Sequence, residues 1–75
     1  MDNSRKRRKI TLGQRIKILR KQRCLTQEGL AIKARVSYTT LTKIENEAIK
    51  NPSFESIAQI AKGLRISLDE LTFTQ

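Results

Sequence analysis

The chain has 75 residues, with 16 Lys and Arg against seven Asp and Glu, no His and one Cys, and its formal net charge is +9. A chain of this length forms one small domain with a modest core, which leaves little room for a deep ligand cavity. Without His, and with Cys24 alone, an intramolecular disulfide is excluded and a zinc site would depend on carboxylates. No nucleophile–base pair and no glycine-rich phosphate loop can be named, so we expect no enzyme, no cofactor and no metal site.

The charge is unevenly distributed along the chain. Residues 1–35 hold 12 Lys and Arg and two acidic residues, whereas residues 36–75 hold four and five. This asymmetry favours a polyanionic partner that meets the N-terminal half, although a merely soluble basic protein is the alternative. No apolar run approaches the ~18 residues of a membrane span, and no signal-peptide core follows the basic start. We therefore expect a cytoplasmic protein.

The first nine residues are predicted to form a disordered basic arm, because adjacent like charges repel one another and cannot pack. Its function is either to settle on DNA phosphates or in a groove, or only to act as a solubilising leader. The cationic residues of this arm are Arg5, Lys6, Arg7, Arg8 and Lys9.

From Thr11 onward the pattern becomes helical. Leu12, Ile16, Leu19 and Arg23 follow one helical face, and Thr11 is a plausible N-cap, so a helix is expected at about residues 12–23. Near the C-terminus, Ser53 caps a predicted helix over residues 54–64, and Ser67 with Glu70 forms a capping box for a short helix that ends near residue 71. The predicted inward residues of the longer helix are Ile57, Ile60, Ala61 and Leu64.

Between these segments, Thr26 and Ser37 are predicted to cap two short helices joined by a tight turn. If Gln27 is counted as the first position, small or apolar residues fall at positions 5, 10, 15 and 18. Ala31 occupies the place where two steeply crossing helices need a small side chain. An ordinary helical hairpin is the alternative interpretation. The predicted inward residues are Leu30, Ala31, Ala34, Val36, Leu41 and Ile44.

This geometry turns the other face of the second helix toward solvent. Lys donates to guanine O6 and N7, Thr contacts a base or the thymine methyl, and Tyr stacks along the groove wall, so Tyr38, Thr39 and Lys43 are the predicted base-reading residues of a major-groove helix. The amides that open the first short helix favour a phosphate, which the Gln27 side chain would help to hold. The predicted phosphate-contacting residues are Gln27, Thr40, Thr42, Asn46 and Lys50.

Over residues 10–72 the chain resembles the XRE family of phage repressor and Cro helix-turn-helix domains. The resemblance implies an all-α, compact five-helix bundle with a lambda-repressor-like helix-turn-helix, DNA binding by the third helix, and a dimer on a palindromic site. It also implies a structural ion pair between Arg20 and Glu45. The blocks that carry it are Leu12-Gly13-Gln14-Arg15-Ile16, Leu19-Arg20, Leu25-Thr26-Gln27-Glu28, Leu30-Ala31, Val36-Ser37, Leu41, Lys43-Ile44-Glu45-Asn46, Lys50-Asn51-Pro52-Ser53, Ile60-Ala61-Lys62, Leu64 and Ser67-Leu68-Asp69-Glu70-Leu71.

The chain departs from the family pattern at several helix ends and inside two helices. Cys24, Arg35, Glu47 and Arg65 stand where the family usually has Gly or Asn, so either the turns differ or each residue carries a left-handed strain of about 1–2 kcal/mol. Glycines replace the usual helix formers at Gly29 and Gly63, at about 1 kcal/mol each relative to Ala.

Two questions of partnership stay open in the sequence. Leu68, Leu71 and Phe73, in the last helix and the tail at residues 73–75, either form a homodimer contact or complete the core. The alternative function is a protein-interaction module of the same fold, an antitoxin or adaptor with weak DNA binding. Single-stranded nucleic acid is disfavoured, because Tyr38, Phe54 and Phe73 make no stacking platform.

Overall fold

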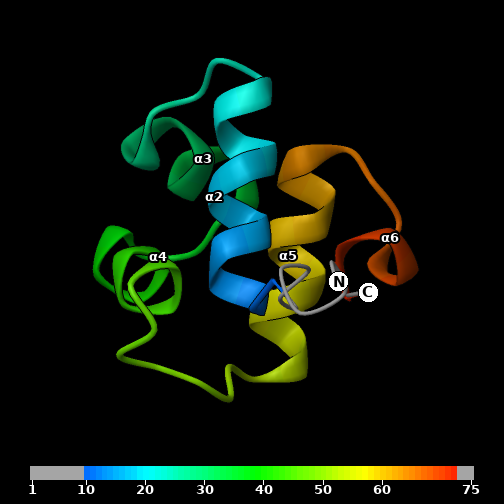
Figure 1. Cartoon of the computed structure of the whole chain (residues 1–75). Coiled ribbons are helices and arrows are strands. Elements are labelled where there is room, and N and C mark those ends of the chain that lie inside the picture. The colour runs from blue at the N-terminus through cyan, green and yellow to red at the C-terminus, as the bar shows by residue number, and fades with distance from the viewer. Residues whose placement is uncertain (1–9, 73–75) are drawn as a thin grey trace, which may run out of the picture.

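The computed structural model describes residues 10–72, and within that range the backbone forms five α-helices and no strand. The helices are α2 (Leu12–Gln22), α3 (Gln27–Ala34), α4 (Tyr38–Glu45), α5 (Phe54–Leu64) and α6 (Leu68–Thr72). In Figure 1, α3 and α4 lie on one side of α2 and α6 lies on the other, while α5 packs along α3 and also contacts α2 and α6. The predicted all-α five-helix fold is confirmed. The predicted arm (residues 1–9) and tail (73–75) lie outside the described residues.

Hydroxyl side chains set the start of every helix. The Oγ atoms of Thr11, Thr26, Ser37 and Ser53 each accept a hydrogen bond from the backbone N–H three residues later, at 2.9–3.1 Å. In α6 the predicted capping box is present, since the Ser67 hydroxyl accepts from the Glu70 N–H and the Glu70 carboxylate accepts from the Ser67 N–H, both at 3.0 Å. These bonds satisfy N–H groups that have no acceptor within the helix, so each cap fixes where its helix begins.

The helix ends keep left-handed turns although no glycine occupies them. The φ angles are 56° at Cys24, 60° at Arg35, 67° at Glu47 and 63° at Arg65. Each of these non-glycine residues therefore carries a strain of about 1–2 kcal/mol. The left-handed turn at Cys24 also explains why α2 ends at Gln22 rather than at residue 23 as predicted.

One core joins all five helices. Every residue predicted to face inward in α3 and α4 is buried, as are Ile60, Ala61 and Leu64 of α5, while Ile57 and Val36 are half-buried against the core. The fully or almost fully buried apolar residues are Ile16, Leu30, Ala31, Ala34, Leu41, Ile44, Ile60, Ala61, Leu64 and Leu71.

One residue assigned to the inner stripe of α2 was placed wrongly. The Arg23 side chain is exposed, and its Nε atom donates to the Leu64 carbonyl oxygen at 2.6 Å. That carbonyl lies at the end of α5, where no N–H group of the helix donates to it, so the arginine supplies the donor from the end of α2. Helical spacing alone could not distinguish this role from packing.

Two glycines allow helices to approach closely. A Cβ atom at Gly13 would overlap the Ile44 carbonyl oxygen, so α2 passes directly against the end of α4. A Cβ atom at Gly63 would lie 3.0 Å from the Cα, Cβ and N atoms of Ala34, where α5 crosses α3. Gly63 therefore permits the tight α3–α5 contact, although glycine lowers the intrinsic helix propensity of α5.

Candidate nucleic-acid interface

The outer face of α4 is held outward by the residues on its opposite face. Leu41 and Ile44 are 0% and 1% exposed and belong to the core. Because they fix the rotation of α4 about its axis, Tyr38, Thr39 and Lys43 are exposed to solvent, with Tyr38 at 51%. The three predicted base-reading residues therefore share one surface on a rigid helix.

The threonine hydroxyls of α4 differ in what they offer a phosphate, which only accepts hydrogen bonds. The Thr40 hydroxyl accepts from the Ser37 hydroxyl at 2.8 Å, so its own proton remains available. The Thr42 hydroxyl donates to the Thr39 carbonyl oxygen at 2.9 Å and must rotate before it can donate elsewhere. The structure thus favours Thr40 over Thr42 as a phosphate donor.

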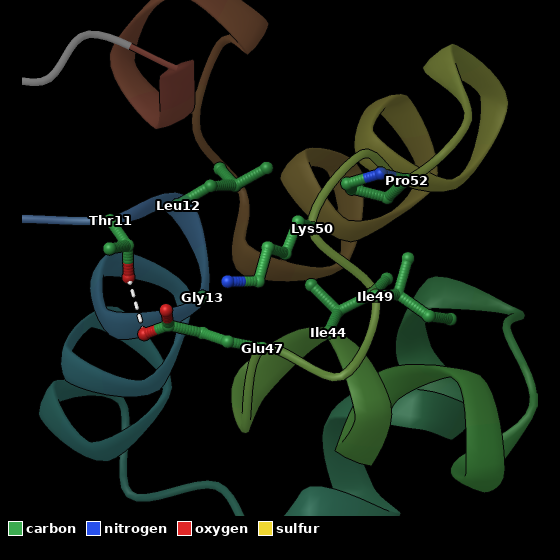
Figure 2. Close-up of a pocket in the computed structure, with 8 residues that line it drawn as sticks. All are labelled: Thr11, Leu12, Gly13, Ile44, Glu47, Ile49, Lys50 and Pro52. Atoms are coloured by element: carbon green, nitrogen blue, oxygen red, sulfur yellow. Dashed lines mark hydrogen bonds between the residues drawn. The ribbon is translucent and has the colours of Figure 1, made fainter.

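Beyond α4, the loop to α5 carries two further predicted phosphate contacts. Asn46 is exposed, and its Oδ1 atom accepts from the Ala48 N–H at 2.9 Å, which leaves the Nδ2 donors for a ligand. Lys50 lines a pocket of about 230 Å³ between this loop and the first turn of α2. Lys50 is exposed, and Figure 2 shows its ammonium group turned toward α2.

Glu47 connects two segments that lie far apart in the sequence. Its carboxylate Oε2 accepts from the Thr11 hydroxyl at 2.9 Å (Figure 2), which joins the loop after α4 to the start of α2. Sequence reasoning missed this contact, and no local signal could have found it, since the two residues are 36 positions apart.

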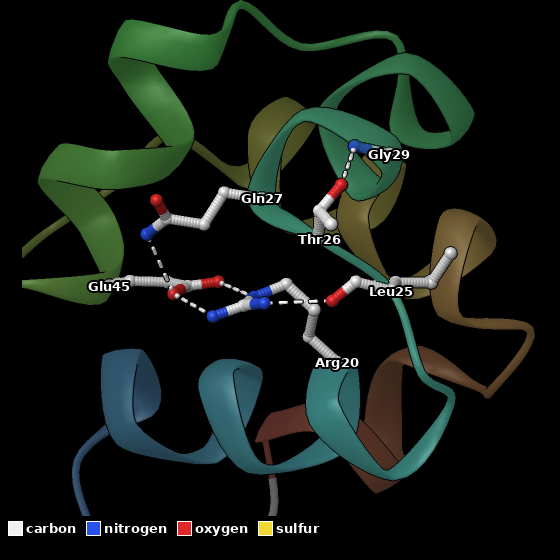
Figure 3. A network of polar contacts seen from close by, with 6 residues as sticks. All are labelled: Arg20, Leu25, Thr26, Gln27, Gly29 and Glu45. Atoms are coloured by element: carbon white, nitrogen blue, oxygen red, sulfur yellow. Dashed lines mark hydrogen bonds and ion pairs between the residues drawn. The ribbon is translucent and has the colours of Figure 1, made fainter.

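The predicted ion pair between Arg20 and Glu45 is present and buried. Arg20 Nε lies 2.8 Å from Glu45 Oε2 and Nη2 lies 3.2 Å from Oε1, with the side chains 10% and 1% exposed. Arg20 Nη1 also donates to the Leu25 carbonyl oxygen at 2.8 Å (Figure 3). The guanidinium group therefore ties α2, the α2–α3 turn and α4 together.

Gln27, at the start of α3, joins the same network. Its Nε2 atom donates to Glu45 Oε1 at 3.1 Å, and the residue is half-buried (Figure 3). The amide predicted to hold a phosphate is therefore already engaged within the protein by one of its two N–H groups. The backbone N–H groups of Gln27 and Glu28, in the first turn of α3, have no acceptor within the helix.

The positive charge of the domain is only partly free for a partner. Residues 10–72 contain 11 Lys and Arg and six Asp and Glu. Besides Arg20 and Arg23, Arg15 is used internally, because its Nε atom donates to the Glu70 carbonyl oxygen at 2.9 Å. Part of the basic character of the N-terminal half therefore holds the helices together.

Within the described residues, no group of three or more His, Cys, Asp or Glu side chains is placed to hold a metal ion. None of the helices over residues 10–72 has the length and apolar character needed to cross a membrane. Cys24 is exposed and forms no disulfide.

Two short helices that meet through a tight turn, with the second presenting exposed polar and cationic side chains, define a helix-turn-helix domain. The helix-turn-helix family matches residues 16–71. The chain belongs to this family.

A phage repressor is similar to most of the chain. The chain is 42% identical over 62 residues to the immunity repressor protein of Bacillus phage phi105, a match that covers 83% of this chain and 42% of the repressor. The chain thus spans less than half the length of that relative.

Solved structures match over most of the chain. SinR, the master regulator for biofilm formation, in complex with DNA has a TM-score of 0.77 and 34% identity, covering 81% of this chain and 97% of that one. A complex of SinR with SinI gives the same score and identity and covers 81% and 59%. The restriction-modification controller protein C.AhdI from Aeromonas hydrophila gives 0.75 and 31%, covering 83% and 92%.

Proposed function

We propose that this chain is a sequence-specific, double-stranded DNA-binding transcriptional regulator of the repressor type, which places α4 in the major groove. The observation that carries the proposal is the exposed face of Tyr38, Thr39 and Lys43 on a helix whose opposite face is buried. The sequence identity of 42% with a phage immunity repressor and of 34% with a DNA-bound regulator supports the proposal. Family and relatives are regulatory proteins, which favours binding over catalysis.

In this proposal the first turn of α4 lies deepest in the groove, as the N-terminal residues of recognition helices do. Lys43 donates to guanine O6 and N7, while Tyr38 and Thr39 contact base edges or a thymine methyl. A bidentate contact such as that of Lys43 with guanine discriminates against the wrong base by about 1–3 kcal/mol.

Phosphates on either side of the groove fix the register of the domain without reading sequence. Gln27 and the first N–H groups of α3 form one phosphate site, because the helix dipole and free donors point outward there. Thr40, Thr42, Asn46 and Lys50 supply the others. The arm residues Arg5, Lys6, Arg7, Arg8 and Lys9 add contacts to the phosphates or to a neighbouring groove.

We propose that the protein acts as a homodimer on a palindromic site. A single module covers only about 600–1,000 Å² of protein surface, which is too little for tight specific binding. Two modules that read half-sites one DNA turn apart, about 34 Å, bind more tightly than one. Of the two roles left open for Leu71, dimer contact or core, its 0% exposure favours the core. Leu68 is half-buried and stays a candidate, and Phe73 lies outside the described residues. Sedimentation that shows only monomer, both free and on DNA, would exclude the dimer.

A cytoplasmic location fits this function and is part of the proposal. The second candidate function is a protein-interaction module of the same fold, such as an antitoxin or adaptor. The similarity to SinR in its complex with SinI favours it as the alternative.

Selection of bound sites from random duplex DNA, followed by affinity measurements at several salt concentrations, tests the proposal. A groove binder loses affinity linearly on a log–log plot, with a slope of about −0.9 per neutralised phosphate. We expect Lys43→Ala to relax preference at one base position and Gln27→Ala to weaken binding to all sequences alike. A flat salt dependence with no enriched sequence would favour the interaction module.

A further inference from the structure

A single buried oxygen connects the ion pair of the core to the proposed DNA surface. Glu45 Oε1 accepts one hydrogen bond from Arg20 Nη2 at 3.2 Å and another from Gln27 Nε2 at 3.1 Å. The Glu45 side chain is 1% exposed, whereas Gln27 is half-buried and opens α3 at the surface. In Figure 3 the side chains of Arg20, from α2, and Gln27, from α3, converge on the carboxylate of Glu45, from α4.

We propose that Glu45, itself held by Arg20, is a positioning residue for DNA binding that fixes the Gln27 amide in the orientation needed to donate to a phosphate. This inference rests on the proposed function and deepens it. One Nε2 N–H of Gln27 is engaged by Glu45, and the other N–H donates to a phosphate beside the N–H groups of Gln27 and Glu28.

The first argument is entropic. A glutamine at the surface loses rotamer freedom when it is immobilised on a ligand. The bond to Glu45 removes that freedom in the free protein, because its acceptor sits on a buried carboxylate that cannot move. Gln27 is then preorganised before DNA arrives, so less entropy is lost on binding.

The second argument is electrostatic. A lone carboxylate beside a phosphate site would repel the phosphate. The guanidinium of Arg20 lies at 2.8 Å and 3.2 Å from the two carboxylate oxygens and balances their charge. The pair can therefore orient Gln27 through a strong, charge-assisted hydrogen bond while presenting no net charge to the DNA.

Two isosteric substitutions separate positioning from plain electrostatics. Glu45→Gln and Glu47→Gln each remove one negative charge near the end of α4, and on charge alone both should strengthen binding to a polyanion. Positioning predicts opposite signs: Glu47→Gln strengthens binding, and Glu45→Gln weakens it about threefold or more, as expected when a hydrogen bond to a charged phosphate is impaired. The loss is expected on both a selected duplex and a mixed-sequence duplex, because phosphate contacts carry no sequence information.

The Gln27→Ala background gives the decisive comparison. Alone, Gln27→Ala weakens binding about tenfold, as expected for a lost charge-assisted hydrogen bond. In that background Glu45→Gln should change affinity less than about twofold, because independent effects add and coupled ones do not. The change caused by Glu47→Gln should be the same in both backgrounds. Thermal unfolding should show that Glu45→Gln lowers stability in both backgrounds. A merely structural role would then lower affinity in both backgrounds as well, whereas positioning lowers affinity only where Gln27 is present.

A measurement on the unsubstituted protein covers the case in which Glu45→Gln does not fold. Relaxation of the Gln27 side-chain ¹⁵Nε2 nucleus should show restricted motion close to that of the α4 backbone. Free rotation of this amide, or equal affinity changes for Glu45→Gln and Glu47→Gln, overturns the inference while leaving DNA binding intact. If the unsubstituted protein binds no duplex, the proposed function fails and this inference fails with it.

Discussion

Replacing Glu45 with Ala tests the buried network most severely. The substitution removes the acceptor of three hydrogen bonds, two from Arg20 at 2.8 Å and 3.2 Å and one from Gln27 at 3.1 Å. It leaves the guanidinium group, only 10% exposed, without a counter-ion. Breaking a buried pair in this way costs about 3–5 kcal/mol, because the remaining charge stays desolvated.

Glu47→Ala is the matched control two residues further along the chain. Glu47 is half-buried, and its side chain accepts one hydrogen bond, from the Thr11 hydroxyl at 2.9 Å. Loss of that bond costs about 0.5–1.5 kcal/mol. A domain of this size unfolds with about 3–9 kcal/mol, so Glu45→Ala removes much of its stability and Glu47→Ala only a small part.

Urea unfolding followed by far-ultraviolet circular dichroism measures both losses. We expect the free energy of unfolding to fall by about 3–5 kcal/mol for Glu45→Ala and by about 0.5–1.5 kcal/mol for Glu47→Ala. The first loss is therefore at least about twice the second. The double substitution Arg20→Met with Glu45→Leu should recover most of the loss, because a packed apolar pair leaves no buried charge. Equal losses for the two alanine variants would refute the structural role of the ion pair.

Two further predictions concern the backbone. Arg35→Gly and Arg65→Gly should each raise the free energy of unfolding by about 0.5–1 kcal/mol, because relief of the left-handed strain exceeds the added entropy of glycine in the unfolded chain; if neither variant is more stable, these turns are not strained. Gly13→Ala should destabilise the domain by about 2 kcal/mol or more, because its Cβ overlaps the Ile44 carbonyl oxygen. Gly29→Ala should be far milder, since its Cβ meets only side-chain atoms, the Thr26 hydroxyl oxygen at 3.2 Å and the Leu25 Cδ2 atom at 3.6 Å. Similar denaturation midpoints for both variants would contradict the α2–α4 approach.

The sequence predicts those parts of the fold that local chemistry decides. A hydroxyl residue before an apolar run has one good use, as a cap, and the caps at Thr26, Ser37 and Ser53 lie where the sequence places them. The inner face of α4 follows as directly, because 3.6-residue periodicity leaves one apolar stripe on it. In α3 periodicity alone is not enough, since the apolar Ile32 is 77% exposed.

Contacts between distant segments could not be predicted in this way. Arg23 has the spacing of a packed residue but serves a carbonyl group of α5. Leu71 lies in a helix of five residues, too short for periodicity to separate a core face from an exposed one. The bond from Gln27 to Glu45 spans 18 residues and two helices, and neither residue carries a local signal for it. The site residues could be named from the motif, whereas their preorganisation required coordinates.

The central claim is that the outer face of α4 enters the major groove. Dimethyl sulfate methylates guanine N7 in the major groove and adenine N3 in the minor groove, so protection of a selected duplex reports which groove is occupied. We expect the protein to protect guanine N7 positions in each half-site, and Lys43→Ala to lose protection at one of them while the rest remain. Protection confined to adenine N3, or a protection pattern unchanged by Lys43→Ala, would contradict the account.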